Sequence, residues 1–313
     1  MELIPTAIDY LLQAPHLTNW PAAIQVIKTI AGAKPSHWMI PAAACQAAAG
    51  TLQAAMPAVA AIAALHTAII MVDDILDNDG RFEPMGFGKG DVANLSLALC
   101  AAGQNAIQRS GVDEHTQCEV FSILNRTLLQ TAVGQNADAH TTVTNEADYW
   151  RITRQKSSPF FGACFSTGAL MGGASPELAQ VMSEIGFIYG EMVQIHDDLK
   201  DILASPASQD WNEGHYSLPV LFALTVDHPN RQTFMEMRKN VSEESVLLAA
   251  QKILIRCGAV SYCAQQLFKR YHSAEDLLNK SNAPDRAPIA ELFQKIIDPV
   301  NHLFDKIGAP RPQ

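Results

Sequence analysis

A run of nineteen residues without a charged side chain, Ala54–Val72, constrains the fold of this chain more than any other feature. The run is long enough to cross a lipid bilayer as a helix. It is rich in alanine, however, contains Pro57 and His66, and ends directly in Asp73 and Asp74. A helix that is buried on all sides inside a large protein has the same composition. We therefore expect a buried core helix here and no membrane span.

The rest of the sequence has a helical pattern almost throughout. Apolar residues recur at helical spacing in five further long segments, 93–111, 115–139, 176–203, 242–281 and 289–308. Strand-like alternation is nearly absent, and Gly and Pro gather in the connections, none of which resembles an interdomain linker. The chain has 313 residues, 48% of them hydrophobic, which is enough for a large core. We predict one all-α domain of roughly ten or more helices over residues 1–313.

The charge balance limits the partners of the chain. The formal net charge is -10 at pH 7, which argues against nucleic-acid binding. An anionic substrate would need local basic residues or metal ions. The N-terminus carries no basic segment of the kind that begins a signal peptide, so we expect a cytoplasmic protein. The cysteines form no CxxC pair, and we expect buried thiols in a reducing compartment at Cys45, Cys100, Cys118, Cys164, Cys257 and Cys263.

Three carboxylates stand at the end of the long apolar run. Asp73 and Asp77 are four residues apart and share one face of a helix, and His66 precedes Asp73 by seven on that face. Carboxylates packed this closely repel one another, and the C-terminal end of a helix disfavours anions further. Hard cations that bind carboxylate oxygens would remove this cost. Asp73, Asp77 and their neighbour Asp74 are therefore candidates for a metal site.

A second cluster repeats the pattern far along the chain. Asp197 and Asp201 are again four apart, with Asp198 beside them, and Gln194 precedes Asp201 by seven. One such DDxxD pattern can be a solvated helix face, but two that both follow apolar stretches favour a site. An EF-hand does not fit, because placing Gly80 at its sixth position leaves no acidic residue at the first or the last. Facing carboxylate clusters suit magnesium ions on a diphosphate, since Mg²⁺ completes its shell with water and phosphate oxygens.

Four segments, in order along the chain, resemble the trans-isoprenyl diphosphate synthase family. They are HTAIIMVDDILD, RQKSSPFFGACFSTGALMGGAS, GEMVQIHDDLKDI and EGHYSLP, and the resemblance that they mark extends in order over most of the chain. The resemblance implies an all-α fold of the isoprenoid synthase type, a bundle around a central apolar cavity with the two aspartate motifs on facing helices. It also implies a homodimer.

The resemblance assigns metal-binding roles to both aspartate motifs. Asp73 and Asp77 would hold magnesium on an allylic diphosphate, and Asp74 would support them. Asp197 would hold another ion, while Asp198 and Asp201 would act directly or through water. About three Mg²⁺ ions would then surround the bound diphosphate, whose oxygens complete their coordination.

The same resemblance assigns three further residues to the allylic substrate. Lys156 would touch the diphosphate and help it leave. Ser157 replaces the family's usual threonine and keeps a hydroxyl near the carbocation. Gln194 would point at the reacting carbons.

The second substrate that the resemblance implies is isopentenyl diphosphate, and here the sequence departs from the family. His66 and Lys34 fall where this substrate is gripped, but the family's Gly-Gly-Lys-Arg-x-Arg-Pro becomes GAKPSHW, with His37 in place of an arginine. The loop after the first motif offers one arginine, Arg81, and the lysine after the second motif becomes His215. Each lost charged hydrogen bond would cost about 1.5–3 kcal/mol of binding. Isopentenyl diphosphate would then bind weakly, bind differently, or not be the acceptor.

Three functions fit these features. The first is magnesium-dependent ionisation of an allylic diphosphate and condensation with isopentenyl diphosphate. The second is a terpene synthase on the same fold, in which the carbocation cyclises or is quenched by water. The loss of basic residues at the positions expected to bind isopentenyl diphosphate favours this function. The third is a non-catalytic subunit of a heteromeric synthase. Such subunits commonly lose aspartates of the motifs, and this chain keeps all six, which argues against this function.

The residues before the first motif bear on product length. Relatives that make fifteen-carbon products carry bulky aromatic residues at one or both of the positions of Ala68 and Ile69, by resemblance. Neither is aromatic here, and the run behind them is mostly alanine. We therefore expect products of twenty carbons or more.

Overall fold

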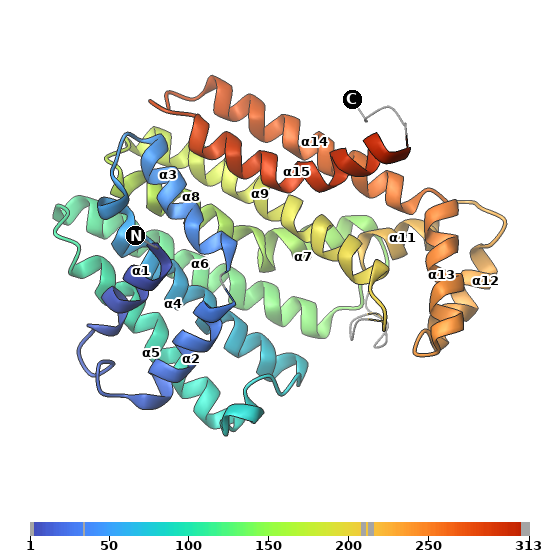
Figure 1. The fold of residues 1–313 in the computed structure, drawn as a ribbon, viewed down its shortest axis with the longest axis horizontal. Coiled ribbons are helices and arrows are strands. Elements are labelled where there is room, and N and C mark those ends of the chain that lie inside the picture. The colour runs from blue at the N-terminus through green and yellow to red at the C-terminus, as the bar shows by residue number, and fades with distance from the viewer. Residues whose placement is uncertain (1–2, 34, 208–210, 212–215, 308–313) are drawn as a thin grey trace.

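The chain folds into α-helices joined by short connections (Figure 1). The computed structural model describes residues 3–33, 35–207, 211 and 216–307. The first half contains α1 (Leu3–Leu12), α2 (Pro21–Gly32), the 3₁₀ helix η1 (Ser36–Met39), α3 (Ile40–Ala47), α4 (Leu52–Asp77), the 3₁₀ helix η2 (Glu83–Met85), α5 (Lys89–Gln108) and α6 (Glu114–His140). The second half contains α7 (Glu146–Lys156), α8 (Ser158–Met171), α9 (Pro176–Leu203), α11 (Leu218–Thr225), α12 (Arg231–Met237), the 3₁₀ helix η3 (Arg238–Asn240), α13 (Glu244–Arg256), α14 (Ala259–Lys280) and α15 (Ala287–Ile307). No strand occurs among the described residues, so the all-α prediction is confirmed.

The long apolar run forms the greater part of α4. Thr51 caps the helix, because its hydroxyl accepts the backbone N–H of Ala54 at 3.1 Å. The helix ends where Asn78 adopts the left-handed conformation, at φ 57°. By length and composition α4 is long and apolar enough to cross a membrane, and 72% of its most apolar window is buried inside the protein. Its many alanines let neighbouring helices approach closely.

Three apolar clusters fill the interior. The largest surrounds α8 and α9, with Phe165 and Met182 at its centre. A second joins α1, α2 and α5 to one side of α4, and a third lies among α11, α12 and α13. Figure 1 shows α14 and α15 lying along α9 and the α11–α13 group standing at one end of the molecule. The prediction that residues 1–313 form one domain stays a prediction.

The segment 242–281, which has a continuous helical pattern, is two helices. Gly258 separates α13 from α14 and adopts φ +90°, a conformation that favours glycine. The two helix axes are bent by 56° at this point. Periodicity did not reveal the break because Gly258 interrupts the apolar pattern by a single position.

The two aspartate motifs lie at corresponding ends of two long helices. Asp77 is the last residue of α4, and Asp201 lies in the last turn of α9. Both helices pack against α8, and in Figure 1 their C-terminal ends lie toward the same side of the molecule. The fold thus brings together two acidic segments that are more than a hundred residues apart in the sequence.

Candidate active site

A lysine at the end of α7 joins the first aspartate motif to α6. The Nζ atom of Lys156 lies 3.1 Å from Asp73 Oδ1 and 2.6 Å from Asp138 Oδ2. The amide of Gln135 donates to the same oxygen of Asp73 at 3.4 Å and to the carbonyl oxygen of Ile69 at 3.3 Å. Three helices, α4, α6 and α7, therefore converge on one cation between two carboxylates.

The charges around Lys156 and Asp77 shift the pKa values of both side chains. Burial alone would lower the pKa of Lys156, but the carboxylates of Asp138 and Asp73 outweigh that effect and raise the pKa above its usual value. Burial, and then the charge of Asp73, raise the pKa of Asp77. The ammonium group thus stays charged, and the cluster holds more negative than positive charge.

Gly134 allows this convergence. A Cβ atom at this position would lie 2.4 Å from the backbone nitrogen of Lys156, closer than real Cβ contacts permit. The backbones of α6 and α7 therefore touch here, and Gln135 and Asp138 follow within one turn of α6. Our sequence analysis missed both residues, because it treated GQNAD only as part of an amphipathic helix. The glycine directly before two polar residues on an otherwise regular helix was the available signal.

Asp74 faces away from the other two acids of its motif. The residue is buried, and its Oδ1 atom accepts the backbone N–H of Arg81 at 2.6 Å. The Arg81 guanidinium itself lies 3.2 Å from Asp79. Asp74 therefore holds the loop that follows α4, and both its supporting role in the motif and its catalytic role stay predictions.

The second motif is organised around Asp198, the most buried of its acids. One carboxylate oxygen accepts the Gln194 amide at 3.0 Å, and the other accepts the Tyr149 hydroxyl and the backbone N–H of Leu218, each at 2.7 Å. Burial raises the pKa of Asp198 to about 6 against the opposing effect of these hydrogen bonds. Because both oxygens are engaged, a direct metal bond to Asp198 would have to replace a protein contact.

Gln194 and Ser157 connect the second motif to the lysine. The Ser157 hydroxyl donates to Gln194 Oε1 at 3.1 Å, and Ser157 directly follows Lys156 in the chain. The Gln194 amide in turn donates to Asp198. The structure thus brings these sequence-predicted residues into one hydrogen-bonded row, and it fixes which end of the Gln194 amide faces the hydroxyl.

The two remaining acids of the second motif influence each other. Desolvation, and then the charge of Asp201, raise the pKa of Asp197, while Lys200 and His196 oppose the rise. Asp201 lines a cavity of about 470 Å³ together with Lys156, Ser157, Gln194 and Asp198. The cavity continues between the ends of α6, α7 and α11. Its volume is of the size that small-molecule sites have.

The two histidines assigned to the second substrate lie together, and neither is among the residues that line this cavity. His37 Nε2 is 3.0 Å from His66 Nε2, and the indole N–H of Trp38 donates to His66 Nδ1 at 3.1 Å. Burial lowers the pKa of His37 to about 4 and that of His66 to about 3. At neutral pH both rings are therefore uncharged, so this pair does not supply the positive charge that an anion-binding site usually has. Lys34 and His215 lie outside the described residues.

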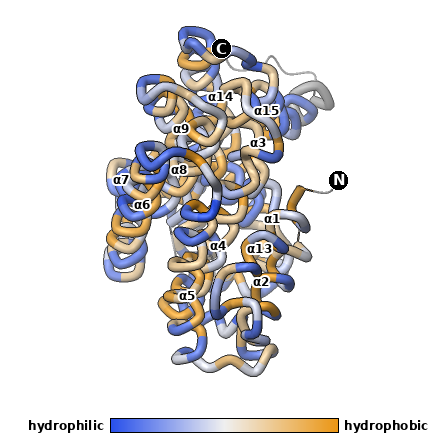
Figure 2. Tube along the Cα trace, turned by 90° about the vertical axis from the view of Figure 1, so that its left-hand side faces the viewer, coloured by the Kyte–Doolittle hydropathy of each residue, from blue (hydrophilic) through white to orange (hydrophobic). Residues whose placement is uncertain are grey.

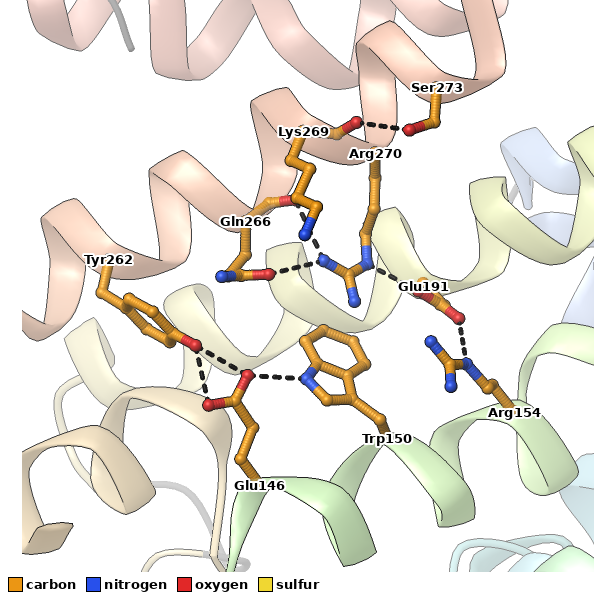
Figure 3. Close-up of polar contacts among 9 residues, drawn as sticks. All are labelled: Glu146, Trp150, Arg154, Glu191, Tyr262, Gln266, Lys269, Arg270 and Ser273. Carbon is orange, nitrogen blue, oxygen red and sulfur yellow. Dashed lines mark hydrogen bonds and ion pairs between the residues drawn. The ribbon is translucent and has the colours of Figure 1, made fainter. Parts of the chain in front are cut away.

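An ion-pair network around the buried carboxylate of Glu191 fixes α7 against α9 and α14 (Figure 3). Glu191 accepts from Arg154 and from Arg270, each at 2.6 Å, and the Arg270 guanidinium stacks on Trp150 at 3.6 Å from the ring centre. Glu191 and Arg270 are nearly buried. A buried carboxylate with two arginine partners is costly to disrupt, because loss of one partner leaves an uncompensated charge.

The same network continues to the start of α7. Glu146 accepts the Trp150 indole N–H at 2.8 Å and the Tyr262 hydroxyl at 2.6 Å (Figure 3). α7 carries five charged residues among its eleven, and their contacts hold the helix together with the buried side chains of Tyr149, Trp150 and Ile152. These contacts orient the helix that ends in Lys156.

The acidic residues have the ligand chemistry that magnesium requires. Asp73 and Asp77 on α4, and Asp197 and Asp201 on α9, offer hard carboxylate oxygens. Within the described part of the chain, no three His, Cys, Asp or Glu side chains gather as a protein-only metal cluster. Magnesium typically binds through one or two carboxylates and takes the rest of its shell from water and substrate phosphates. The residues therefore fit Mg²⁺ that arrives with a phosphorylated substrate.

Comparison with known proteins places the chain among prenyl synthases. The polyprenyl synthetase family model matches residues 24–254. Geranylfarnesyl diphosphate synthase of Aeropyrum pernix is 27% identical over 261 residues, which cover 78% of this chain and 81% of that protein. Geranylgeranyl diphosphate synthase of Methanosarcina mazei is 28% identical over 233 residues, 70% of this chain and 71% of that protein.

Solved structures share the fold at low sequence identity. The geranylgeranyl pyrophosphate synthetase of Geoglobus acetivorans superposes with a TM-score of 0.77 at 22% identity, covering 94% of this chain and 95% of the other. A decaprenyl diphosphate synthase of Rhodobacter capsulatus has a TM-score of 0.79 at 19% identity, with 95% of each chain covered.

Proposed function

We propose a function from the premise that this chain belongs to the polyprenyl synthetase family and is a prenyltransferase. It ionises an allylic prenyl diphosphate with the help of Mg²⁺ and condenses it with isopentenyl diphosphate. The product is a trans-prenyl diphosphate of twenty carbons or more, as the names of the relatives from Aeropyrum pernix and Methanosarcina mazei suggest. The observation that carries the proposal is the Lys156 ammonium group, held between Asp73 and Asp138 at the end of α4.

The residues around Lys156 suit the departure of a diphosphate. Enzymes of this family use Mg²⁺ through the diphosphate, and the ions supply charge neutralisation for the leaving group. Asp73 and Asp77 would hold ions from α4, and Asp197 and Asp201 would hold ions from α9. About three ions are expected with diphosphate bound. Lys156 would then donate to a diphosphate oxygen as the carbon–oxygen bond breaks and the electron pair leaves with the diphosphate.

The hydrogen-bonded row beside Lys156 suits the carbocation that remains. The hydroxyl oxygen of Ser157 and the amide oxygen of Gln194 would place partial negative charge near the reacting carbons. Asp198 fixes the Gln194 amide by accepting its N–H. The double bond of isopentenyl diphosphate attacks the cation, and a proton then leaves from the new carbon chain to the released diphosphate. Asp198 acts here as a positioning residue, since its oxygens already accept three protein hydrogen bonds.

One observation favours the terpene synthase as a second candidate. The His37–His66 pair is uncharged at neutral pH, in the region where the resemblance places the diphosphate of the second substrate. An enzyme that ionises its allylic substrate without a second diphosphate would have no need of positive charge there. Product formation without isopentenyl diphosphate would identify this case.

The surface of α5 and α6 supports a homodimer. Leu97 on α5 and Leu129 and Val133 on α6 are 72%, 71% and 60% exposed. The helices are joined by a hydrogen bond from the Gln104 amide to Asn125, and Figure 2 shows hydrophobic stretches on both. Apolar side chains exposed this far on adjacent helices are typical of a surface that another protein covers. Of the six cysteines that we expected to be buried, Cys45, Cys164 and Cys263 are buried, Cys100 and Cys257 are partly buried, and Cys118 is exposed. The cytoplasmic location stays a prediction.

Metal dependence tests the proposed chemistry. We expect Asp73→Asn and Asp197→Asn each to lower turnover of farnesyl diphosphate with isopentenyl diphosphate by at least about a hundredfold, because charge stabilisation of the leaving group is lost. Mass spectrometry of the products, with Mg²⁺ or with EDTA, measures the effect, and circular dichroism checks the fold. Asp276→Asn on the exposed face of α14 is the control. Full activity in EDTA, or in either variant, would refute the proposed function.

Sedimentation tests the dimer. We expect a mass of 68.0 kDa, twice the 34.0 kDa of the chain, because the α5–α6 surface buries its apolar side chains in a second copy. Leu129→Glu should shift the protein to the monomer, since a buried unpaired charge disfavours the contact. Leu248→Glu, at an exposed apolar position on α13, should leave the mass unchanged. A wild-type monomer at micromolar concentration would contradict the dimer.

Ile69 is the residue best placed to limit product length. Its side chain packs against the large core of α8 and α9, one turn before Asp73, whereas Ala68 is buried in the cluster shared with α5. Ile69→Phe adds a ring on the face of the site, and we expect shorter products than those of the wild type, as measured by mass spectrometry. Ile70→Phe, which places the same ring in the other cluster, is the control. Unchanged products in Ile69→Phe, or wild-type products that stop at fifteen carbons, would show that another residue limits the chain.

A further inference from the structure

A second cavity lies between α1, α2 and η1, and we call it the α1–α2 cavity. Its volume is about 500 Å³, close to the 470 Å³ of the cavity beside Lys156, and no described residue lines both cavities. In Figure 1, α1 and α2 stand at the end of the molecule away from the α11–α13 group. The α1–α2 cavity is therefore separate from the candidate active site and large enough for a molecule of substrate size.

The walls of this cavity are almost entirely apolar. Seven of the nine lining residues carry no polar side chain: Leu3, Ile4, Pro5, Ile8, Ala31, Gly32 and Met39. Leu3, Ile4 and Met39 pack against the apolar cluster shared with α5, yet they remain only partly buried. An apolar ligand would remove that surface from water, and the gain grows with the area covered. The cavity thus favours a ligand with a hydrocarbon body.

The other two lining residues are one acid and one base, Asp9 on α1 and Lys28 on α2. Both are exposed, and neither makes a hydrogen bond or an ion pair with a residue that the structure describes. Ala31 and Gly32 belong to the last turn of α2, whose C-terminal end carries partial negative charge. The cavity therefore offers no net attraction to an anion such as a diphosphate. An uncharged hydroxyl group can accept from Lys28 or donate to Asp9.

We propose that the α1–α2 cavity binds a prenyl alcohol, an uncharged isoprenoid chain that ends in a hydroxyl group. The chain lies on the apolar wall, and the hydroxyl group hydrogen-bonds to Lys28 or to Asp9. No bond of the ligand changes on binding. This inference rests on the proposed function, because a prenyltransferase handles chains of this chemistry and the α1–α2 cavity is as large as its substrate cavity.

The charged groups of the two cavities select different end groups. Asp138, Asp198 and Asp201 line the cavity beside Lys156, so a diphosphate there needs metal ions that neutralise the acids. In the α1–α2 cavity the single acid and the single base balance each other. Binding of an alcohol in the α1–α2 cavity therefore requires no Mg²⁺ and does not depend on salt, because no net charge is neutralised.

Equilibrium dialysis of the whole protein against radiolabelled farnesol measures the binding. We expect the dissociation constant to be the same in EDTA and in Mg²⁺, and the same at low and at high salt. Unlabelled farnesyl diphosphate in EDTA should compete at least about tenfold more weakly than unlabelled farnesol, because Asp9 and the end of α2 repel its charge.

A variant that fills the cavity shows where the alcohol binds. A Cβ atom added at Gly32 would meet no atom within 4 Å, so a leucine side chain can enter the cavity without a clash. We expect Gly32→Leu to weaken farnesol binding by at least about tenfold, because the ligand loses part of its apolar contact. Gly90→Leu on α5, where an added Cβ also meets no atom within 4 Å, is the matched control. Ala31→Leu is a second filling variant if Gly32→Leu does not fold.

A change of charge tests the selection of the end group. Asp9→Lys places two ammonium groups at the cavity, and the exposed position leaves the fold intact. We expect farnesyl diphosphate to compete at least about tenfold better than with the wild type, because the anion now meets net positive charge. Farnesol binding should stay within about threefold, because an uncharged ligand responds little to this change. Circular dichroism checks the fold of each variant.

Farnesol that enters the site beside Ile69 instead would bind equally well to Gly32→Leu and poorly to Ile69→Phe, and that result would overturn the inference. No farnesol binding by the wild type, or a preference for farnesyl diphosphate in EDTA, would also overturn it. Metal-dependent elongation, assayed on the same preparations, separates this inference from the proposed function. A wild type that elongates but binds no farnesol removes only the inference. A wild type that binds farnesol in the cavity but never elongates removes the proposed function.

Discussion

The ammonium group of Lys156 between two carboxylates is the interaction on which the site depends. Asp73 comes from α4 and Asp138 from α6, and the lysine ends α7, so one cation fixes three helices. Acidic groups gathered at a helix end would otherwise repel one another and the helix dipole. In the proposed function the same lysine turns to the diphosphate once metal ions neutralise the aspartates. The ammonium group of Lys156 would thus stabilise the free enzyme through its contacts with the aspartates. It would assist catalysis through its contact with the diphosphate.

The surrounding structure keeps that lysine in place. The close backbone approach at Gly134 sets the distance between α6 and α7, and Glu191 holds α7 through Arg154 and α14 through Arg270. Because Arg154, Glu191 and Arg270 do not line the cavity, their ion pairs fix α7 without entering it. The hydrogen bonds from Ser157 to Gln194 and from Gln194 to Asp198 then connect the end of α7 to the second motif.

The sequence was sufficient for the fold class and for the two motifs, because helical periodicity and the DDxxD spacing are local patterns. It could not show that Asp198 is enclosed by three hydrogen bonds while Asp197 is not, since both stand next to each other in the chain. Gly134 marked this part of α6, but the sequence could not show that Asp138 pairs with Lys156, which is 18 residues away and on another helix. The uncharged state of His37 follows from its burial, which lowers its pKa and which the sequence alone could not show.

Magnesium binding by Lys156→Met tests the central claim that this lysine balances the charge of the first aspartate motif in the free enzyme. Calorimetry should show Mg²⁺ alone binding several-fold more tightly than in the wild type, because a competing cation is gone. Mg²⁺ with inorganic pyrophosphate should bind more weakly, because the diphosphate has lost its donor. Lys89→Met, whose ammonium group donates to Asn78 Oδ1 at 2.6 Å, is the control. Unchanged affinities in both titrations would contradict the account and leave Lys156 as a structural ion pair.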